Sequence, residues 1–295
     1  MYAELHCVSN FTFLRGASHP EELVARAYEL GYAALAITDE CSLAGIVRAH
    51  VEAKKCGLPL IIGSEFRLDD GLRLVLLATD RESYGRLSAL ITRGRRSAVK
   101  GSYRLTRADL GDGVDGCLAL WLPGHEPEAD EARWLSARFR GVLWIAAERL
   151  LDADDAARCE KLTLIAESLG LPIAAAGDVH MHERERRALR DTLTAIRLKT
   201  SVAEAGYALH PNGERYLRPL ETLRRVYPAA WLAETLAIAQ RCRFSLDTLR
   251  YEYPEEIVPA GESTTSYLRR LTEEGFARRL PIESTPEDKR AKVRK

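Results

Sequence analysis

Side chains that can bind metal ions follow several short apolar segments of this 295-residue sequence. His6 lies in the first segment and Glu65 follows the third, whereas Asp178 and His180 follow the last. Imidazole nitrogens and carboxylate oxygens are suitable ligands for Zn²⁺, Mn²⁺ or iron. Because side chains alternate along a strand, the Asp-x-His spacing directs both side chains to one side. Together these residues predict a metal site, either occupied or ancestral.

Each of these residues, considered alone, could have a simpler structural role instead of binding metal. A lone histidine in a strand, such as His6, is usually a hydrogen-bonded core residue. A carboxylate after a strand is often the N-cap of the next helix, and we expect this role for Asp39. The neighbouring Glu40 stays among the candidate ligands. We expect His182 to begin the following helix and to face solvent.

Seven apolar segments alternate with helical patterns over the first 180 residues. They contain mainly Leu, Ile, Val and Ala and do not alternate with polar residues, which is typical of strands buried on both faces in a parallel sheet. Asp70-Gly71 predicts a hairpin between the third and fourth segments. Strands are expected at 4–8, 33–38, 59–66, 73–78, 117–122, 141–147 and 172–178.

Helical patterns separate these strands and also dominate the later part of the chain. Ser18 with Glu21 has the spacing of a capping box for the first helix. Six or seven strand–helix units favour a closed barrel, and the carboxyl ends of its strands would gather the polar residues at one rim. Helices are expected at 20–30, 43–56, 84–92, 154–169, 186–200, 220–227, 229–242 and 266–280.

Composition restricts the class of protein. The net charge is zero and the pI is about 7.1, so only local patches could attract nucleic acid. The six cysteines form no Cys-x-x-Cys pair, and neither a signal peptide nor a membrane-length apolar run is present, which predicts a cytoplasmic protein that does not enter a membrane. We expect a barrel domain with trailing helices at 1–250 and a second, incomplete region at 251–295, with a linker near 250–262.

The segments LHCVSNFTFLRGA, ALAITDECSLAG, IIGSEF, RLVLLA and AAAGDVH occur in this order. They resemble the polymerase and histidinol phosphatase (PHP) domain that opens the α subunits of bacterial DNA polymerase III. ITDECSLAGIVRAH, AAGDVHMH, RRALRDTLTAIRLKTSVAEAGYAL and RYLRPLETL are similar to the error-prone, damage-induced branch. The resemblance covers essentially the whole chain. It implies a distorted (β/α)7 barrel, a cluster of up to three metal ions in intact members, and the beginning of a polymerase palm or thumb region after residue 250.

The first half of the chain departs from the ligand pattern that the resemblance implies. Val8 stands where the second histidine of His-x-His is expected. Arg15 stands where an aspartate often precedes Gly-Ala, and Glu40 replaces the histidine of Thr-Asp-His. Valine has no ligand atom, so the first of these changes removes a metal ligand outright.

Further departures follow in the middle of the chain. Arg73 occupies the place of a histidine before the fourth strand. Trp121 stands where a cysteine or histidine is expected near the fifth strand, with His125 as a weaker substitute. The ligand candidates that remain, for vestigial or weak binding, are His6, Glu40, Glu65, Asp178 and His180.

These changes predict that arginines partly replace the metal ions. Arg15 and Arg73 carry fixed positive charge and can form forked contacts with carboxylates that would otherwise repel one another. At most one weakly held Zn²⁺ or Mn²⁺ is then expected. Hydrolysis of phosphoesters needs a metal-activated water, so little or no such activity is expected.

A basic segment spans residues 92–107 and contains six Lys or Arg residues, Tyr103 and no acidic residue. An isolated basic stretch is usually a solvated surface loop, and we favour that interpretation. The functional alternative is a loop that contacts the phosphate backbone of DNA. Its candidate DNA contacts are Arg93, Arg95, Arg96, Lys100 and Arg104.

Three functions are compatible with these patterns. The first is a structural domain of an error-prone polymerase used in damage-induced mutagenesis and translesion synthesis; the resemblance then implies Mg²⁺-dependent nucleotidyl transfer by residues outside this chain. The second is an active metal-dependent phosphoesterase that cleaves pyrophosphate, a phosphomonoester or a DNA 3′ end. The third is an interaction module for mutagenesis or replication proteins such as the sliding clamp. The partners implied are the rest of the polymerase chain and DNA.

Overall fold

The computed structural model describes residues 1–111, 114–249 and 257–294. The chain folds as two compact units, Met1–Leu249 and Arg250–Lys295. Part of the linker predicted at 250–262, namely 250–256, lies outside the described residues.

Seven strands form one sheet in the order β1 to β7. Neighbouring strands are parallel except that β4 is antiparallel to both β3 and β5. A parallel bridge between Cys7 and Val179 joins the two ends of the sheet, so the barrel is nearly closed and the predicted distorted (β/α)7 barrel is confirmed. The strands are β1 Ala3–Glu4, β2 Ala34–Ile37, β3 Leu60–Arg67, β4 Arg73–Ala78, β5 Cys117–Trp121, β6 Leu143–Glu148 and β7 Ile173–Ala176.

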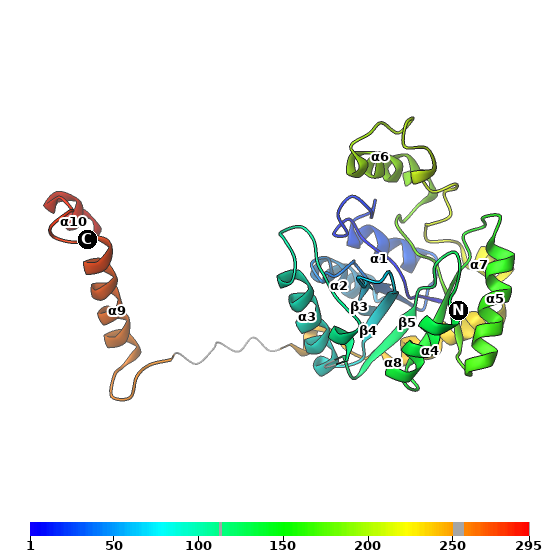
Figure 1. Cartoon of the computed structure of the whole chain (residues 1–295), viewed down its shortest axis with the longest axis horizontal. Coiled ribbons are helices and arrows are strands. Elements are labelled where there is room, and N and C mark those ends of the chain that lie inside the picture. Colours follow the sequence, from blue (N-terminus) through cyan, green and yellow to red (C-terminus); the bar gives the residue numbers. More distant parts are fainter. Residues whose placement is uncertain (112–113, 250–256, 295) are drawn as a thin grey trace. The chain divides into compact units, whose positions relative to one another are not determined.

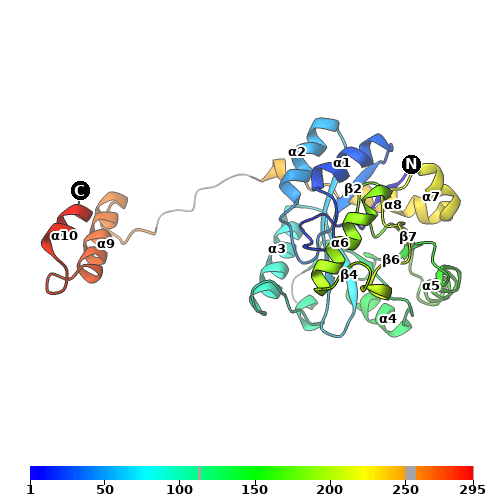
Figure 2. The same cartoon turned by 90° about the horizontal axis from the view of Figure 1, so that it is seen from above.

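Helices surround the barrel, while α6 lies across one of its ends (Figures 1 and 2). The helix α4 was not predicted, and α3 extends beyond both ends of the predicted range 84–92. The first helix begins at Pro20 as predicted, but its capping box is formed by His19 and Glu22 rather than by Ser18 and Glu21, with Glu22 accepting from the backbone N–H of His19 over 2.8 Å. The helices of this unit are α1 Pro20–Glu29, α2 Ile46–Cys56, α3 Arg81–Arg96, α4 Ala129–Arg138, α5 Asp155–Leu169, α6 Arg187–Leu198, α7 Leu220–Val226 and α8 Ala229–Arg241.

The predicted hairpin at Asp70-Gly71 reverses the chain between β3 and β4. Gly71 has a φ of +94°, a conformation that glycine adopts without steric cost. Because β4 runs antiparallel, its first residue, Arg73, pairs with Arg67 at the carboxyl end of β3. The hairpin therefore delivers Arg73 to the same barrel rim as the strand-end residues, which we call the mouth.

Two apolar layers hold the barrel together. Alternate residues of β2 face opposite sides, with Ala34 and Ala36 in the barrel interior and Leu35 and Ile37 beneath the helices. Ile238 of α8 completes the interior cluster. The small alanines of β2 and β7 leave space inside the barrel, and larger side chains such as Leu77 of β4, Leu120 of β5 and Trp144 of β6 fill it.

The second unit contains α9 Thr264–Arg279 and α10 Glu287–Arg294. The hydroxyl of Ser263 accepts the backbone N–H of Ser266 over 3.2 Å and begins α9. None of the described residues of α9 is buried. Across the described part of the chain, every helix is too short or too polar to cross a membrane.

Candidate functional site

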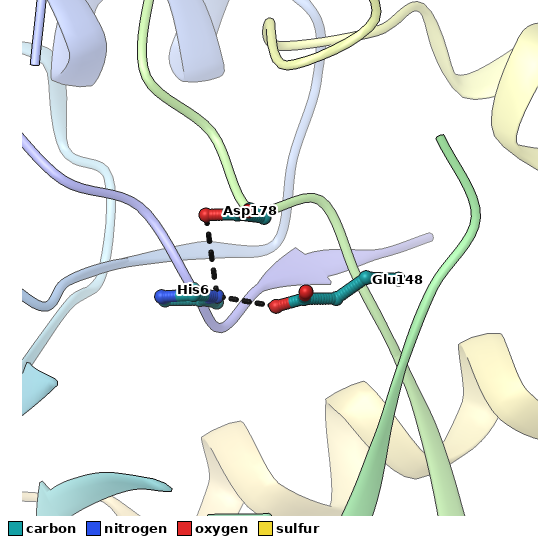
Figure 3. Close-up of side chains that lie close together, drawn as sticks. All are labelled: His6, Glu148 and Asp178. Atoms are coloured by element: carbon teal, nitrogen blue, oxygen red, sulfur yellow. Dashed lines mark hydrogen bonds and ion pairs between the residues drawn. The ribbon is translucent and has the colours of Figure 1, made fainter. Parts of the chain in front are cut away.

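His6 follows β1 and is completely buried beneath the mouth. Its Nδ1 is 2.6 Å from Oε1 of Glu148 and 3.8 Å from Oδ1 of Asp178 (Figure 3), and its Nε2 is 3.0 Å from Oε2 of Glu65. Burial lowers the pKa of His6, but the hydrogen bonds to Glu148 and Glu65 outweigh burial and raise it above the ordinary value. An imidazolium that donates from both nitrogens fits this geometry.

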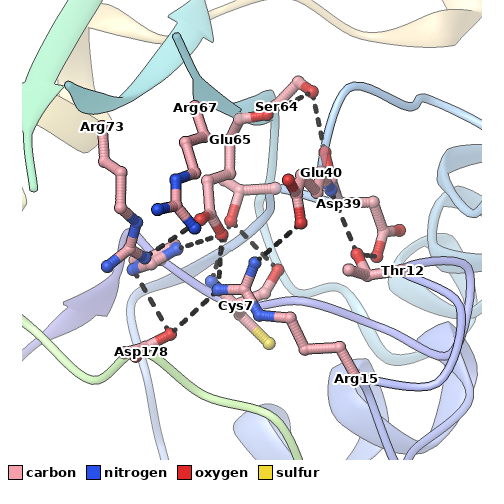
Figure 4. A network of polar contacts seen from close by, with 12 residues as sticks. Cys7, Thr12, Arg15, Asp39, Glu40, Ser64, Glu65, Arg67, Arg73 and Asp178 are labelled. Carbon is pink, nitrogen blue, oxygen red and sulfur yellow. Dashed lines mark hydrogen bonds and ion pairs between the residues drawn. The ribbon is translucent and has the colours of Figure 1, made fainter. Parts of the chain in front are cut away.

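Glu65 is the acid on which the positive charges converge (Figure 4). Nη2 of Arg15 lies 2.7 Å from its Oε2, and Nη2 of Arg73 donates to its Oε1 over 3.0 Å. Burial raises the pKa of Glu65, but the charge of Arg15 and the hydrogen bond from His6 outweigh burial and hold it well below the usual range. Glu65 is therefore an ionised carboxylate inside the protein.

Arg15 also contacts two further acids. Its Nη1 donates to Oε2 of Glu40 over 3.1 Å, and its Nη2 is 3.6 Å from Oδ1 of Asp178. Burial lowers the pKa of Arg15, but the charges of Glu65 and Glu40 raise it above the ordinary value. One guanidinium group thus lies among three carboxylates.

Asp39 fixes the loop that carries this guanidinium, residues 9–18. Its carboxylate accepts the backbone N–H and the hydroxyl of Ser9, both over 2.8 Å, and the hydroxyl of Thr12 over 2.7 Å. The prediction that Asp39 caps the next helix is wrong, because α2 begins only at Ile46. Its role is to hold the loop against the end of β2.

Asp178 follows β7 in a left-handed conformation, with a φ of +42°. Its Oδ1 is 3.0 Å from Nε2 of His180, and it also forms an ion pair with Arg215. Burial, followed by the charge of Arg15, lowers the pKa of His180 well below the ordinary value. His180 is therefore neutral at physiological pH.

A cavity of about 470 Å³ opens at the mouth of the barrel. Thr194 and Arg197 of α6 line it from above. The structure thus brings the predicted ligand candidates together around one space, with His6 buried directly below Glu65. Six of the residues that line the cavity are Arg15, Glu40, Glu65, Arg73, Asp178 and His180.

Residues 4–175 of this chain match the PHP domain. The chain belongs to the PHP domain family. It is 58% identical over 294 residues to the error-prone DNA polymerase of Methylococcus capsulatus, covering 99% of this chain and 28% of that protein. It is 58% identical over 294 residues to the error-prone DNA polymerase of Pseudomonas aeruginosa, covering 100% of this chain and 28% of that protein. The chain therefore spans less than a third of the length of these relatives.

A solved structure shares the PHP fold at low sequence identity. The crystal structure of a candidate metal-dependent phosphoesterase from Bifidobacterium adolescentis aligns with a TM-score of 0.50 and 16% identity. The alignment covers 76% of this chain and 94% of that chain. At this level of identity the likeness concerns the fold alone.

Two of the positions at which a ligand was predicted to be replaced do not face the cavity. Val8 is buried at the seam between β1 and β7, where its backbone N–H donates to the carbonyl of Val179 over 2.9 Å. Trp121 is buried on the outside of the barrel, and its Nε1 donates to Oε2 of Glu131 on α4 over 3.0 Å. His125, the weaker substitute, lines an adjoining cavity of about 80 Å³.

Two residues of the PHP site were not predicted. Glu148 is the last residue of β6, one position beyond the predicted strand, and its strand-end position was the signal that could have found it. Burial raises the pKa of Glu148, but its hydrogen bond with His6 lowers it to about 2. Arg215 comes from a loop far along the chain, and burial lowers its pKa to about 10.

His182 has a different position from the one predicted. Its side chain is only 12% exposed, and its Nδ1 is 2.8 Å from the hydroxyl of Ser18. The backbone N–H of His182 also donates to that hydroxyl over 2.9 Å. His182 therefore joins the loop of residues 9–18 to the segment after β7, and the prediction that it faces solvent is wrong.

The basic segment is partly helical, because Arg93, Arg95 and Arg96 lie in the last turn of α3. Arg93 is 3.7 Å from a carboxylate oxygen of Asp109. Arg95 donates to the carbonyls of Glu40 over 3.2 Å and Cys41 over 3.1 Å.

The loop after α3 is also attached to the mouth. Arg104 contacts Asp69 over 2.6 Å. The hydroxyl of Tyr103 donates to Oε1 of Glu40 over 2.8 Å and accepts the backbone N–H of Arg67 over 2.9 Å. Of the five candidate DNA contacts, the two that are exposed and make no side-chain hydrogen bond or ion pair within the described part of the chain are Arg96 and Lys100.

Three side chains below the mouth offer ligand atoms for the metal cluster that the PHP fold implies. Nδ1 of His6 and carboxylate oxygens of Glu148 and Asp178 lie within 4.8 Å of one another, a combination that could hold one divalent ion. The same Nδ1, however, faces Glu148 as a hydrogen-bond partner, and Asp178 is paired with Arg215. These residues do not fit a cluster of three ions.

Proposed function

We propose that this chain is the N-terminal, structural PHP domain of an error-prone DNA polymerase and that it has little or no hydrolytic activity. The observation that carries this proposal is the position of Arg15, within 3.6 Å of Glu40, Glu65 and Asp178. A guanidinium group at this point supplies the positive charge that neighbouring carboxylates require. It cannot activate a water molecule as a metal ion does.

The balance of charge supports the proposal. Four carboxylates in one ion-pair network face three guanidinium groups and a histidine whose pKa is raised, so these acids have cationic partners without a divalent ion. A bound ion would have to displace an arginine or leave positive charge unpaired in a largely buried site. The acids are Glu40, Glu65, Glu148 and Asp178. The bases are His6, Arg15, Arg73 and Arg215.

The relatives support the assignment to a polymerase. Proteins named error-prone DNA polymerase are 58% identical to this chain over nearly its whole length. We propose that the longer protein synthesises DNA during damage-induced mutagenesis and translesion synthesis, with Mg²⁺ bound by carboxylates outside this chain. Residues 251–295 then begin the palm or thumb region. In this proposal the rest of the polymerase chain and DNA are the principal partners, with the sliding clamp as a further candidate.

Metal content and phosphoesterase activity test the proposal together. The purified chain is analysed for bound metals and then incubated with pyrophosphate, a phosphomonoester or single-stranded DNA in the presence of Mn²⁺ or Zn²⁺. We expect less than one ion per chain and no turnover above that of a matched His6→Ala, His180→Ala double variant. Stoichiometric metal together with turnover that the double variant lacks would overturn the structural assignment.

The alternative function is an active phosphoesterase of the pyrophosphatase or 3′–5′ exonuclease type. It is favoured by the closeness of the ligand atoms of His6, Glu148 and Asp178. One Zn²⁺ or Mn²⁺ bound there could orient a phosphate and lower the pKa of a water molecule. In that case Glu148→Gln would remove both the metal and the turnover, whereas Glu126→Gln, an exposed control, would remove neither.

A further inference from the structure

The helix α6 has its polar side turned inward and its apolar side turned toward solvent. Arg190, Asp191 and Thr194 are buried, with exposed fractions of 1%, 9% and 8%. Leu189 and Ile196, on the opposite side of the helix, are 41% and 55% exposed. A helix on the surface of a soluble protein normally has the reverse arrangement.

Polar contacts attach the helix to the rest of the unit: Arg186 at its start donates to Oε1 of Glu22 over 2.6 Å, and Nη2 of Arg187 donates to the carbonyl of Pro211 over 3.4 Å. Nε and Nη2 of Arg190 donate to Oδ1 of Asp191, over 3.2 and 2.7 Å, and Nη2 is 3.5 Å from the carbonyl oxygen of Asn212. The hydroxyl of Thr194 donates to the carbonyl of Arg190 over 3.1 Å. The helix is thus held over the mouth by polar contacts, and its apolar side is not needed for that attachment.

The apolar residues of the outward side form one stripe, in which Leu189 and Ile196 are exposed and Leu193 between them is half-buried. Leu189, Leu193 and Ile196 are four and three residues apart, a spacing that places them on one face of an α-helix. Lys199 stands beyond the end of this stripe and is exposed without an ion-pair partner among the described residues, and Arg197, which also lines the cavity at the mouth, has no such partner either. A surface that covers the stripe would therefore combine an apolar centre with an acidic rim.

We propose that the stripe Leu189–Leu193–Ile196 docks against an apolar, acid-rimmed surface in the remainder of the longer polymerase chain. This inference rests on the proposed function. The stretch shared with the relatives is 28% of their length, so most of such a polypeptide lies outside this chain. A covalently linked surface has a high effective concentration, which lets a small apolar stripe dock stably.

Cysteine labelling tests the proposed docking. Ile196→Cys is compared with Leu164→Cys, a control at a 66% exposed position on α5. Each is placed in the 295-residue chain and in the full-length polymerase, with the unsubstituted proteins measuring the reactivity of the native cysteines. We expect maleimide labelling at position 196 to be at least about tenfold slower in the full-length polymerase than in the 295-residue chain. A slowing of about tenfold corresponds to a docked state that is favoured about ten to one over the exposed state. Labelling at position 164 should be unchanged.

Every other result counts against the proposal. Equally fast labelling at position 196 in both proteins would show that the stripe remains exposed. Slow labelling in the 295-residue chain that depends on its concentration would identify a second copy as the occupant. Protection that requires an added protein would identify a separate partner. Primer extension by the same full-length protein tests the proposed function independently of the labelling.

A second pair of variants separates docking from folding. Leu189→Glu with Ile196→Glu changes only solvent-facing side chains, so the thermal stability of the 295-residue chain should not fall. In the full-length polymerase the same double variant should increase protease cleavage around α6. It should also raise the labelling rate of a cysteine at position 193 to the rate that this cysteine has in the 295-residue chain. Unchanged cleavage and labelling in the full-length variant would overturn the proposal.

Discussion

Nη2 of Arg15 lies 2.7 Å from Oε2 of Glu65, a carboxylate whose side chain is only 1% exposed. The arginine comes from the loop after β1 and the glutamate from β3, so this pair connects two elements at the mouth. Because Glu65 is ionised and buried, any change that removes its cations leaves a charge without adequate compensation. The pair therefore links the stability of the unit to the chemistry of the site.

Arg15→Ala should destabilise the protein by about 2–3 kcal/mol, somewhat less than is typical for breaking a buried pair, because Glu65 keeps its contacts with His6 and Arg73. Urea unfolding of the 295-residue chain measures this difference. Arg26→Ala is the matched control, since Arg26 forms an exposed pair with Glu29 that contributes about 0–1 kcal/mol. Equal losses for the two variants would contradict the importance of the Arg15–Glu65 pair.

Replacing arginines by histidines should restore metal binding. Arg15→His with Arg73→His removes two fixed positive charges beside Glu65 and adds two imidazoles. We expect the affinity for Zn²⁺ to rise by about tenfold or more, because each removed charge lowers the repulsion that a divalent ion meets. Titration calorimetry at neutral pH measures the change. Arg26→His with Arg81→His alters the same charge away from the mouth, and a similar gain there would contradict the prediction.

The fold was predictable because its strands are buried on both faces. Segments 34–37 and 173–176 are uninterrupted apolar runs, and each of the seven predicted strands overlaps an observed one, although β1 is only Ala3–Glu4 against the predicted 4–8. The helix α4 was missed because only Ala132 and Leu135 are buried within it, too few to make an apolar pattern. The helix α6 was predicted from its periodicity alone, and periodicity does not say which face points inward.

The site was predictable where its residues lie at strand ends. Glu65, Asp178 and His180 were found in this way, and Glu148 was missed by one position because the predicted strand stopped at Ala147. Arg215 had no local signal, since only the folding of a distant loop places it beside Asp178. Sequence patterns report local structure, whereas ion pairs across the barrel depend on the complete fold.

Tyr103→Phe should loosen the loop that follows α3. It removes the hydroxyl that bonds to Glu40 and accepts from the backbone of Arg67, at an expected cost of about 1–2 kcal/mol. Protease cleavage within residues 97–107 should become faster, because the loop is no longer fixed at the mouth. Tyr207→Phe is the control, as Tyr207 is fully exposed. A cleavage rate equal to that of the control would mean that the hydroxyl does not hold the loop.

DNA binding by the full-length polymerase should depend on Arg96 and Lys100 rather than on Arg95. Arg95 bonds to the carbonyls of Glu40 and Cys41, so its reversal would disturb the fold as well as any interaction with DNA. Arg96→Glu with Lys100→Glu should weaken binding and flatten the dependence of log K on log salt by about 0.9 for each phosphate that the protein no longer neutralises.

The matched control for this DNA-binding test reverses two exposed arginines at the opposite end of the barrel. Arg81 follows β4, and Arg140 precedes β6, so both lie away from the mouth. Arg81→Glu with Arg140→Glu changes the net charge by the same amount. If both double variants reduce affinity and salt dependence equally, net charge explains the effect and the basic segment makes no specific contact. A weakening confined to the first variant, with unchanged thermal stability, assigns the phosphate contacts to the end of α3 and the loop that follows it.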